Sequence, residues 1–159
     1  MHRKVLSAQQ LERRGANAVA ELLMRTLIVP KIYFEASWPT RLNKVDVLAV
    51  DRAGAGDIHV VEVKVGNSEL PHSIASVKQV PAHYKYLALL ENGSYWPSED
   101  LLYAADGMGR IGLIRIEERD NEMQATLFSR PERFRIEPAS VRQIEQFTKK
   151  NPPDWEIRP

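Results

Sequence analysis

The chain has 159 residues, 43% of them hydrophobic and 27% charged, which fits a single domain spanning residues 1–159 with a sizeable core. Its formal net charge is only +1, so bulk electrostatics does not indicate a polyanionic partner. It has no cysteine, which excludes disulfides, thiol nucleophiles and cysteine-bound zinc, and it has neither a membrane-spanning apolar run nor a signal peptide. We therefore expect a cytoplasmic protein that does not contact the membrane.

The first two elements are predicted from residues 7–28 and 31–38. Ser7 and Gln10 form a capping box at the start of a helix. A broad apolar face follows, made of Leu11, Val19, Leu22, Leu23 and Leu27. Residues 31–38 then predict a strand that ends before Pro39.

Residues 43–66 read as two apolar strands joined by a short turn that contains glycine. If Asp51 pairs with Asp57 across this turn, the antiparallel register places Asp46 directly opposite Glu62. Like charges opposite each other on a ladder repel, and strands this apolar are expected to be covered on at least one side. The hairpin therefore predicts a positive charge between the two carboxylates.

Two groups can supply that charge. Lys64 lies two residues after Glu62 and shares its face of the strand, so it supplies part. A hard divalent cation, Mg²⁺ or Mn²⁺, bound by Asp46, Glu62 and the backbone carbonyl of Val63, meets the need better. The alternative is that Glu62 and Lys64 form a simple salt bridge on a solvated strand end.

The segments VDVLAVD and VVEVKVG resemble the core of the PD-(D/E)XK nuclease superfamily. Asp46 matches the first motif, with Val45 where the motif's name has proline, and Glu62 and Lys64 match the second. The resemblance implies an α/β (α+β) class with a restriction endonuclease-like αβββαβ core, in which helices flank a mixed central sheet.

The resemblance also implies accessory site residues. RGANAVAELL is similar to the first helix of resolvase-like and RecB-like members, whose glutamate joins the metal cluster, and this gives Glu21 a metal-binding and catalytic role. The alternative for Glu21 is an ion pair with Arg25 one turn later. KQVPAHYKYL resembles the RecB-type glutamine and tyrosine pair that faces the substrate, which gives Gln79 a catalytic role, although Tyr84 follows it by five residues rather than four.

Later segments complete the expected fold. Residues 71–91 predict a helix interrupted by Pro81, and residues 101–106 a fourth strand parallel to the third. RIGLIRIEE and QATLFS predict a hairpin, and residues 138–150 a last helix. None of the four histidines has the spacing of metal ligands; we expect His59 on the face away from Glu62 and His83 at the surface.

The first functional hypothesis is a metal-dependent nuclease that hydrolyses phosphodiester bonds of DNA, acting in repair, restriction or defence. Lys64 would orient or deprotonate the attacking water and stabilise the oxyanion. RNA as substrate, a homodimer and a larger protein partner are left open. The second hypothesis is an inactive nuclease-like module that binds nucleic acid or protein. The third is a small α/β protein without a nucleic-acid role, in which the register would place Asp46 away from Glu62.

Overall fold

A computed structural model describes residues 6–37, 44–51, 56–66, 70–90 and 110–156 of the chain. Its elements run in the order α1 (Ala8–Thr26), β1 (Lys31–Ala36), β2 (Val45–Val50), β3 (Ile58–Val65), α2 (Leu70–Lys78), β4 (Tyr84–Leu90), β5 (Gly112–Arg119), β6 (Glu122–Ser129), α4 (Pro138–Lys150) and β7 (Trp155–Glu156). From α1 to β4 this is the predicted αβββαβ order, so the fold class is confirmed.

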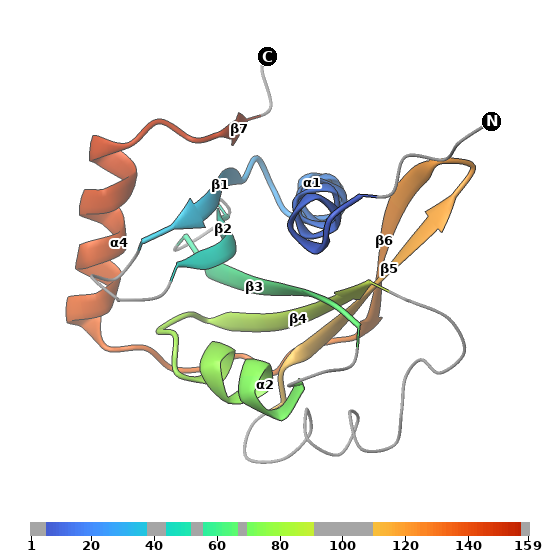
Figure 1. The fold of residues 1–159 in the computed structure, drawn as a ribbon. Helices are drawn as coiled ribbons and strands as arrows, with labels where there is room; N and C mark the ends of the chain where they lie inside the picture. Colours follow the sequence, from blue (N-terminus) through green and yellow to red (C-terminus); the bar gives the residue numbers. More distant parts are fainter. Residues whose placement is uncertain (1–5, 38–43, 52–55, 67–69, 91–109, 157–159) are drawn as a thin grey trace.

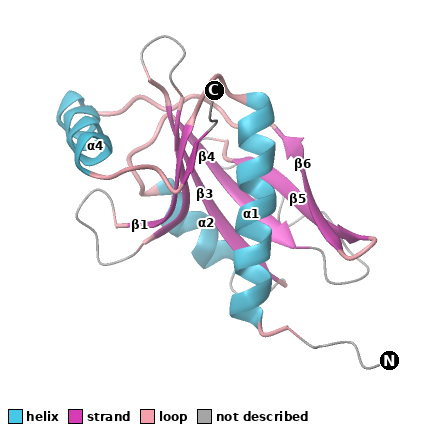
Figure 2. Cartoon of the chain, turned by 90° about the horizontal axis from the view of Figure 1, so that it is seen from above, coloured by secondary structure: helices cyan, strands magenta, loops and turns pink. Residues whose placement is uncertain are grey.

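The strands form one mixed sheet in the order β6-β5-β4-β3-β2-β1-β7. β1, β2 and β3 are antiparallel neighbours, whereas β4 runs parallel to both β3 and β5. α1 lies across one face of this sheet, and α2 lies on the opposite face (Figure 1). Seen from above, α1 crosses the middle strands and α4 stands at the β1 side of the sheet (Figure 2).

Two hydrophobic cores therefore lie on the two faces of the sheet. The α1-side core contains Val19 and Leu23 of the helix together with Val61 and Val63 of β3. The α2-side core contains Leu48, Val60, Leu87, Ile74 of α2 and Ile144 of α4. Because β3 and β4 are covered on both faces, their sequences read as nearly continuous apolar runs.

α1 begins as the sequence predicts. The Ser7 hydroxyl accepts the backbone N–H of Gln10, and the Gln10 side chain accepts the backbone N–H of Ser7. Near its middle the helix approaches the sheet closely, since a Cβ on Gly15 would lie 3.1 Å from Ile116 Cδ1 and 3.2 Å from Val63 Cγ1. Gly15, unfavourable in an isolated helix, is thus explained by packing.

The predicted register of the central hairpin is confirmed. Leu48 pairs with Val60 and Val50 with Ile58, and the Asp51 N–H donates to the Asp57 carbonyl at 2.9 Å. The ladder ends at Val47 and Val61, one residue before Asp46 and Glu62 would face each other.

The single helix predicted over residues 71–91 is wrong. α2 ends at Lys78, and Tyr84–Leu90 form β4, which pairs in parallel with β3. A short apolar run with aromatic residues fits a doubly buried strand as well as a helix, and Pro81 separates two elements instead of kinking one. β4 occupies the place expected for the fourth strand, while residues 101–106 lie outside the described residues.

The C-terminal part matches its prediction. β5 and β6 form the expected hairpin, whose turn residues Asp120 and Asn121 both have positive φ, as a two-residue hairpin turn requires. α4 spans the predicted residues 138–150, and its Phe147 ring packs edge-on against Tyr33 with centroids 5.1 Å apart.

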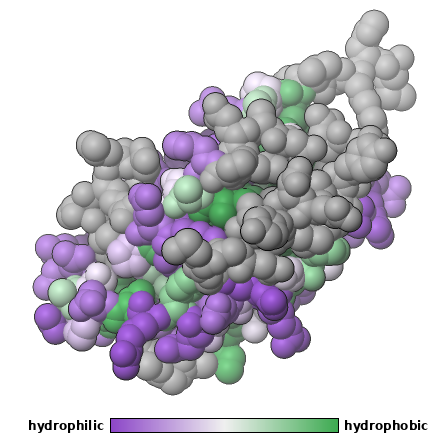
Figure 3. All heavy atoms as spheres, turned by 90° about the horizontal axis from the view of Figure 1, so that it is seen from below, coloured by the Kyte–Doolittle hydropathy of each residue, from purple (hydrophilic) through white to green (hydrophobic). Residues whose placement is uncertain are grey.

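On the α2 side of the molecule, the described residues at the surface are mostly polar, with smaller apolar areas between them (Figure 3). Within the described ranges, no helix is long and apolar enough to cross a membrane.

Candidate functional site

At Glu35 in β1 and Asp46 in β2, both strands twist, so that the side chains after this point change the face of the sheet on which they lie. Glu35 has a φ of 50°, in the left-handed region that residues with side chains adopt only rarely. Across it the alternation changes, because Phe34 packs with the α1-side core and Ala36 with the α2-side core. Phe34 still pairs with Val47 and Ala36 with Val45 on either side of Glu35, so the register between the two strands is kept. Asp46 therefore lies where the strands turn, and such local strain is a feature of functional sites.

The Asp46 carboxylate bonds to the neighbouring strand. Its Oδ2 accepts the backbone N–H of Val63 at 2.7 Å, beyond the point where the regular ladder with β3 ends. Burial raises the pKa of Asp46, and the charges of Glu12 and Glu35 raise it further, whereas the Val63 hydrogen bond and Lys64 lower it. The Asp46 carboxylate is thus held at Val63, the residue between Glu62 and Lys64 on β3.

Glu62 and Lys64 form the second part of the site. Glu62 Oε1 lies 3.9 Å from Lys64 Nζ, and the side chains are 22% and 33% exposed, so both reach solvent. Burial raises the pKa of Glu62 to about 7, and the charges of Asp46 and Glu12 add to this while Lys64 opposes it. The sequence prediction that Asp46 and Glu62 lie close enough to repel each other is therefore supported by the electrostatics.

Glu12 on α1 is a site residue that sequence reasoning missed. Its charge raises the pKa of both Asp46 and Glu62, which places it near both. Gly15 is the feature of the sequence that could have indicated the position of Glu12. A helix that touches the sheet at Gly15 brings a side chain one turn earlier over the end of β3.

The accessory residues named from the resemblance lie elsewhere. Glu21 is exposed and follows Glu12 by nine residues, which is roughly 13 Å along the helix and half a turn around it. Gln79 is also exposed and lies just after α2; the neighbouring Lys78 carbonyl accepts a hydrogen bond from Lys85, near the start of β4. Neither Glu21 nor Gln79 lines the cavity beside Asp46, and their roles stay predictions.

Two histidines, His59 in β3 and His83 directly before β4, are structural. His59 is on the face away from Glu62, as predicted, stacked on Tyr84 with ring centroids 4.8 Å apart. The prediction of a surface position for His83 is wrong, because His83 is buried and its Nδ1 accepts the Ile58 N–H at 2.9 Å. Burial is the main cause that lowers the pKa of both rings, to about 4 for His59.

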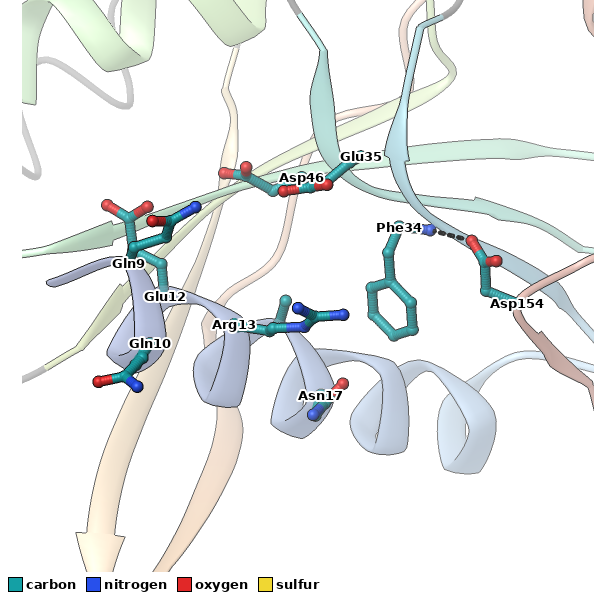
Figure 4. Close-up of a pocket in the computed structure, with 10 residues that line it drawn as sticks. Gln9, Gln10, Glu12, Arg13, Asn17, Phe34, Glu35, Asp46 and Asp154 are labelled. Atoms are coloured by element: carbon teal, nitrogen blue, oxygen red, sulfur yellow. Dashed lines mark hydrogen bonds between the residues drawn. The ribbon is translucent and has the colours of Figure 1, made fainter. Parts of the chain in front are cut away.

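A cavity of about 760 Å³ opens beside Asp46. α1, β1, β2 and the segment before β7 line it, through Gln9, Gln10, Glu12, Arg13, Ala16, Asn17, Phe34, Glu35, Asp46 and Asp154. Glu12 and Asp46 lie toward one end, and Phe34 and Asp154 toward the other (Figure 4). The cavity is large enough for a ligand of several hundred Å³.

The carboxylate oxygens near Asp46 suit a hard cation, although they are too few to surround it completely. The charge of Glu12 raises the pKa of both Asp46 and Glu62, and the charge of Asp46 also raises that of Glu62; a bound divalent ion would relieve that repulsion. In the part of the chain that the structure describes, no three Asp, Glu or His side chains lie close enough to surround a metal ion. An ion held by one or two carboxylates and several waters, as Mg²⁺ prefers, is consistent with both observations.

Comparisons with known proteins bear on the fold only. No protein-family model matches the chain, and no curated protein matches it. Among solved structures the chain is similar to the SPO1766 protein of unknown function from Silicibacter pomeroyi, with a TM-score of 0.59 and 19% identity. The alignment covers 93% of this chain and 88% of that one. At this identity the likeness supports the fold and carries no function.

Proposed function

We propose that the protein is a metal-dependent nuclease of the PD-(D/E)XK type that hydrolyses phosphodiester bonds of DNA. The observation that carries the proposal is the hydrogen bond from the Val63 N–H to Asp46, which holds the Asp46 carboxylate beside the residue between Glu62 and Lys64. Asp46 and the Glu62–Lys64 segment are far apart in the sequence, and this hydrogen bond between their strands supports a shared site.

Each residue of the site would have the role that its chemistry allows. Asp46 and Glu62, with the carbonyl of Val63, would hold Mg²⁺ or Mn²⁺, and Glu12 adds negative charge nearby. When bound, such an ion supplies a polarised water and neutralises charge on the phosphate. Lys64, 3.9 Å from Glu62 and partly exposed, is placed to orient the attacking water and to donate to a phosphate oxygen. The absence of cysteine suits the reducing cytoplasm, where we propose that the protein acts.

The experiment is cleavage of supercoiled plasmid and of single-stranded DNA in EDTA, Mg²⁺ and Mn²⁺. Glu62→Gln and Lys64→Met are each expected to lower the metal-dependent rate by roughly two to four orders of magnitude, the usual contribution of a positioned acid, base or charged donor. Glu118→Gln, a change of an exposed carboxylate on β5, is the matched control and should leave the rate unchanged. Equal cleavage by wild type and Glu62→Gln would refute the proposal.

The alternative is an inactive module of the same fold that binds nucleic acid or a protein partner. The pKa of Glu62, raised mainly by burial and further by the charge of Asp46, disfavours it, because a pure binding module gains nothing from a buried carboxylate near a second one. Calorimetric titration with Mn²⁺ separates the two: a nuclease binds the ion through Asp46 and Glu62, and Asp46→Asn abolishes the heat. Activity that appears only with a second chain or a dimer would still require the ion.

A further inference from the structure

The cavity beside Asp46 has two chemically different ends. Glu12, Glu35 and Asp46 gather at one end, while Arg13, Asn17 and Phe34 face each other toward the other end (Figure 4). Arg13 follows Glu12 directly and Asn17 is one helical turn after Arg13, so α1 places both on the side that faces β1. The end with Arg13 is not used by the metal-binding residues.

Arg13 is available to a ligand. It is exposed, and it makes no hydrogen bond or ion pair with another described residue. Two of the carboxylates that line the cavity are already engaged. Asp46 accepts the Val63 N–H, and Asp154 accepts the Phe34 N–H at 2.8 Å. Arg13 is the one cation among the residues that line the cavity.

The far wall is built by the segment before β7. Asp154 is fixed by its own N–H, which donates to the Ile32 carbonyl at 2.9 Å, and the Tyr33 hydroxyl donates to the Asn151 carbonyl at 2.9 Å. With α1 on one side and this segment on the other, the cavity is a hollow of about 760 Å³. That volume is within the range of sites that hold small ligands, and a single nucleotide is a ligand of that class.

Phe34 gives the hollow an aromatic wall. Its ring is half-buried and lies across from Arg13 and Asn17. Aromatic rings beside cationic and amide side chains are how proteins bind unpaired nucleotides, because every base has a face to stack and every nucleotide a phosphate to neutralise.

We propose that this cavity binds one unpaired nucleotide of the substrate strand next to the bond that is cut, with its base on Phe34 and its phosphate on Arg13. The substrate class is therefore single-stranded or locally unpaired nucleic acid. This inference rests on the proposed nuclease function. It also explains why the site needs a cation: the four carboxylates that line the cavity, three at one end and Asp154 near Phe34, would otherwise repel the strand.

The test measures binding separately from cleavage. The full chain carrying Lys64→Met keeps every carboxylate of the site, and its affinity for a labelled oligonucleotide, alone or annealed to its complement, is followed by fluorescence anisotropy in Mg²⁺ across a salt series. In this background, Arg13→Gln should weaken single-strand binding about tenfold and reduce the slope of log K against log salt by about 0.7, the value for one lost phosphate contact. Phe34→Leu keeps apolar volume and should weaken binding about fivefold without changing the slope.

Arg25→Gln removes an exposed arginine in the last turn of the same helix and is the matched control, which should change neither quantity. Should Phe34→Leu fail to fold, Arg13→Gln decides the question alone, since the exposed Arg13 has no partner among the described residues whose loss could unfold the protein. Unchanged single-strand affinity and slope for Arg13→Gln overturn the inference, as does duplex binding as tight as single-strand binding.

Failures of the two proposals are distinguishable. If wild type cuts DNA in a metal-dependent way but Arg13→Gln leaves strand binding unchanged, the nuclease stands and the cavity assignment falls. If wild type does not cut and the Lys64→Met protein binds no strand, both proposals fall.

Discussion

Replacing Glu62 by glutamine is expected to stabilise the protein at neutral and alkaline pH but not in acid. Burial, helped by the charges of Asp46 and Glu12, raises the pKa of Glu62 from its ordinary value of 4.5 to about 7. Glutamine has nearly the same shape and cannot ionise, so the variant removes the charge while leaving the packing almost unchanged. The test therefore isolates the energetic penalty of holding a carboxylate at this site.

The magnitude follows from the difference between the folded and unfolded pKa. Between pH 4.5 and pH 7 the folded protein binds the proton of Glu62 more tightly than the unfolded chain does, so the wild type loses stability as the pH rises through this window. At 1.36 kcal/mol for each pKa unit, the full loss is about 3 kcal/mol. For a chain of this size that corresponds to roughly 6–12 °C in melting temperature.

Urea unfolding curves of wild type and Glu62→Gln, measured from pH 4 to pH 8 in EDTA, check this expectation. The advantage of Glu62→Gln should grow by about 3 kcal/mol across that range. Glu118→Gln, on the exposed end of β5, supplies the control and should show no such growth. A stability difference that is the same at both ends of the range would refute the reasoning, because it would mean that Glu62 ionises in the folded protein as it does in water. Adding Mg²⁺ at pH 8 should stabilise wild type more than the variant.

Three further expectations follow from the same structure. Glu12→Gln should lower the pKa of Glu62 below about 7, which an NMR titration of the Glu62 carboxyl group measures. Glu21→Gln, on the opposite side of α1, is the control and should not lower it. Equal pKa shifts in the two variants would show that Glu12 has no special effect on Glu62. His59, whose folded pKa of about 4 lies below its ordinary 6.5, contributes stability above pH 6.5 that is lost as the pH falls toward 4, so His59→Phe should flatten the acid limb of the unfolding profile by about 3 kcal/mol. Ile144→Ala should cost about 2–5 kcal/mol in urea unfolding, because this side chain of α4 is 2% exposed in the α2-side core; a loss below about 1 kcal/mol would mean that α4 docks loosely.

Local patterns were enough to predict most elements near the site. The capping box of Ser7 and Gln10 determined where α1 begins, and the pairing of Asp51 with Asp57 determined the register of the central hairpin. Both depend on contacts between residues a few positions apart, which a sequence displays directly. The same register predicted Asp46 opposite Glu62, one residue beyond the point where the observed ladder ends.

Where burial on both sides erases the pattern, the sequence was insufficient. The run from Tyr84 to Leu90 has no alternation to distinguish a strand from a helix, and only its pairing with β3 identifies it as β4. His83 was expected at the surface for the same reason, since nothing in its neighbours reveals that its ring accepts the Ile58 N–H.

The sequence by itself predicted the αβββαβ order and the hairpin register that directs Asp46 toward Glu62, because strand alternation and hairpin register are local properties. Only the tertiary structure revealed that Glu12 of α1 lies near enough for its charge to raise the pKa of Asp46 and Glu62. That proximity depends on how deeply the helix sits on the sheet, which the contact at Gly15 sets. The tertiary structure likewise creates the cavity between Arg13 and Phe34, whose walls come from segments more than a hundred residues apart along the chain.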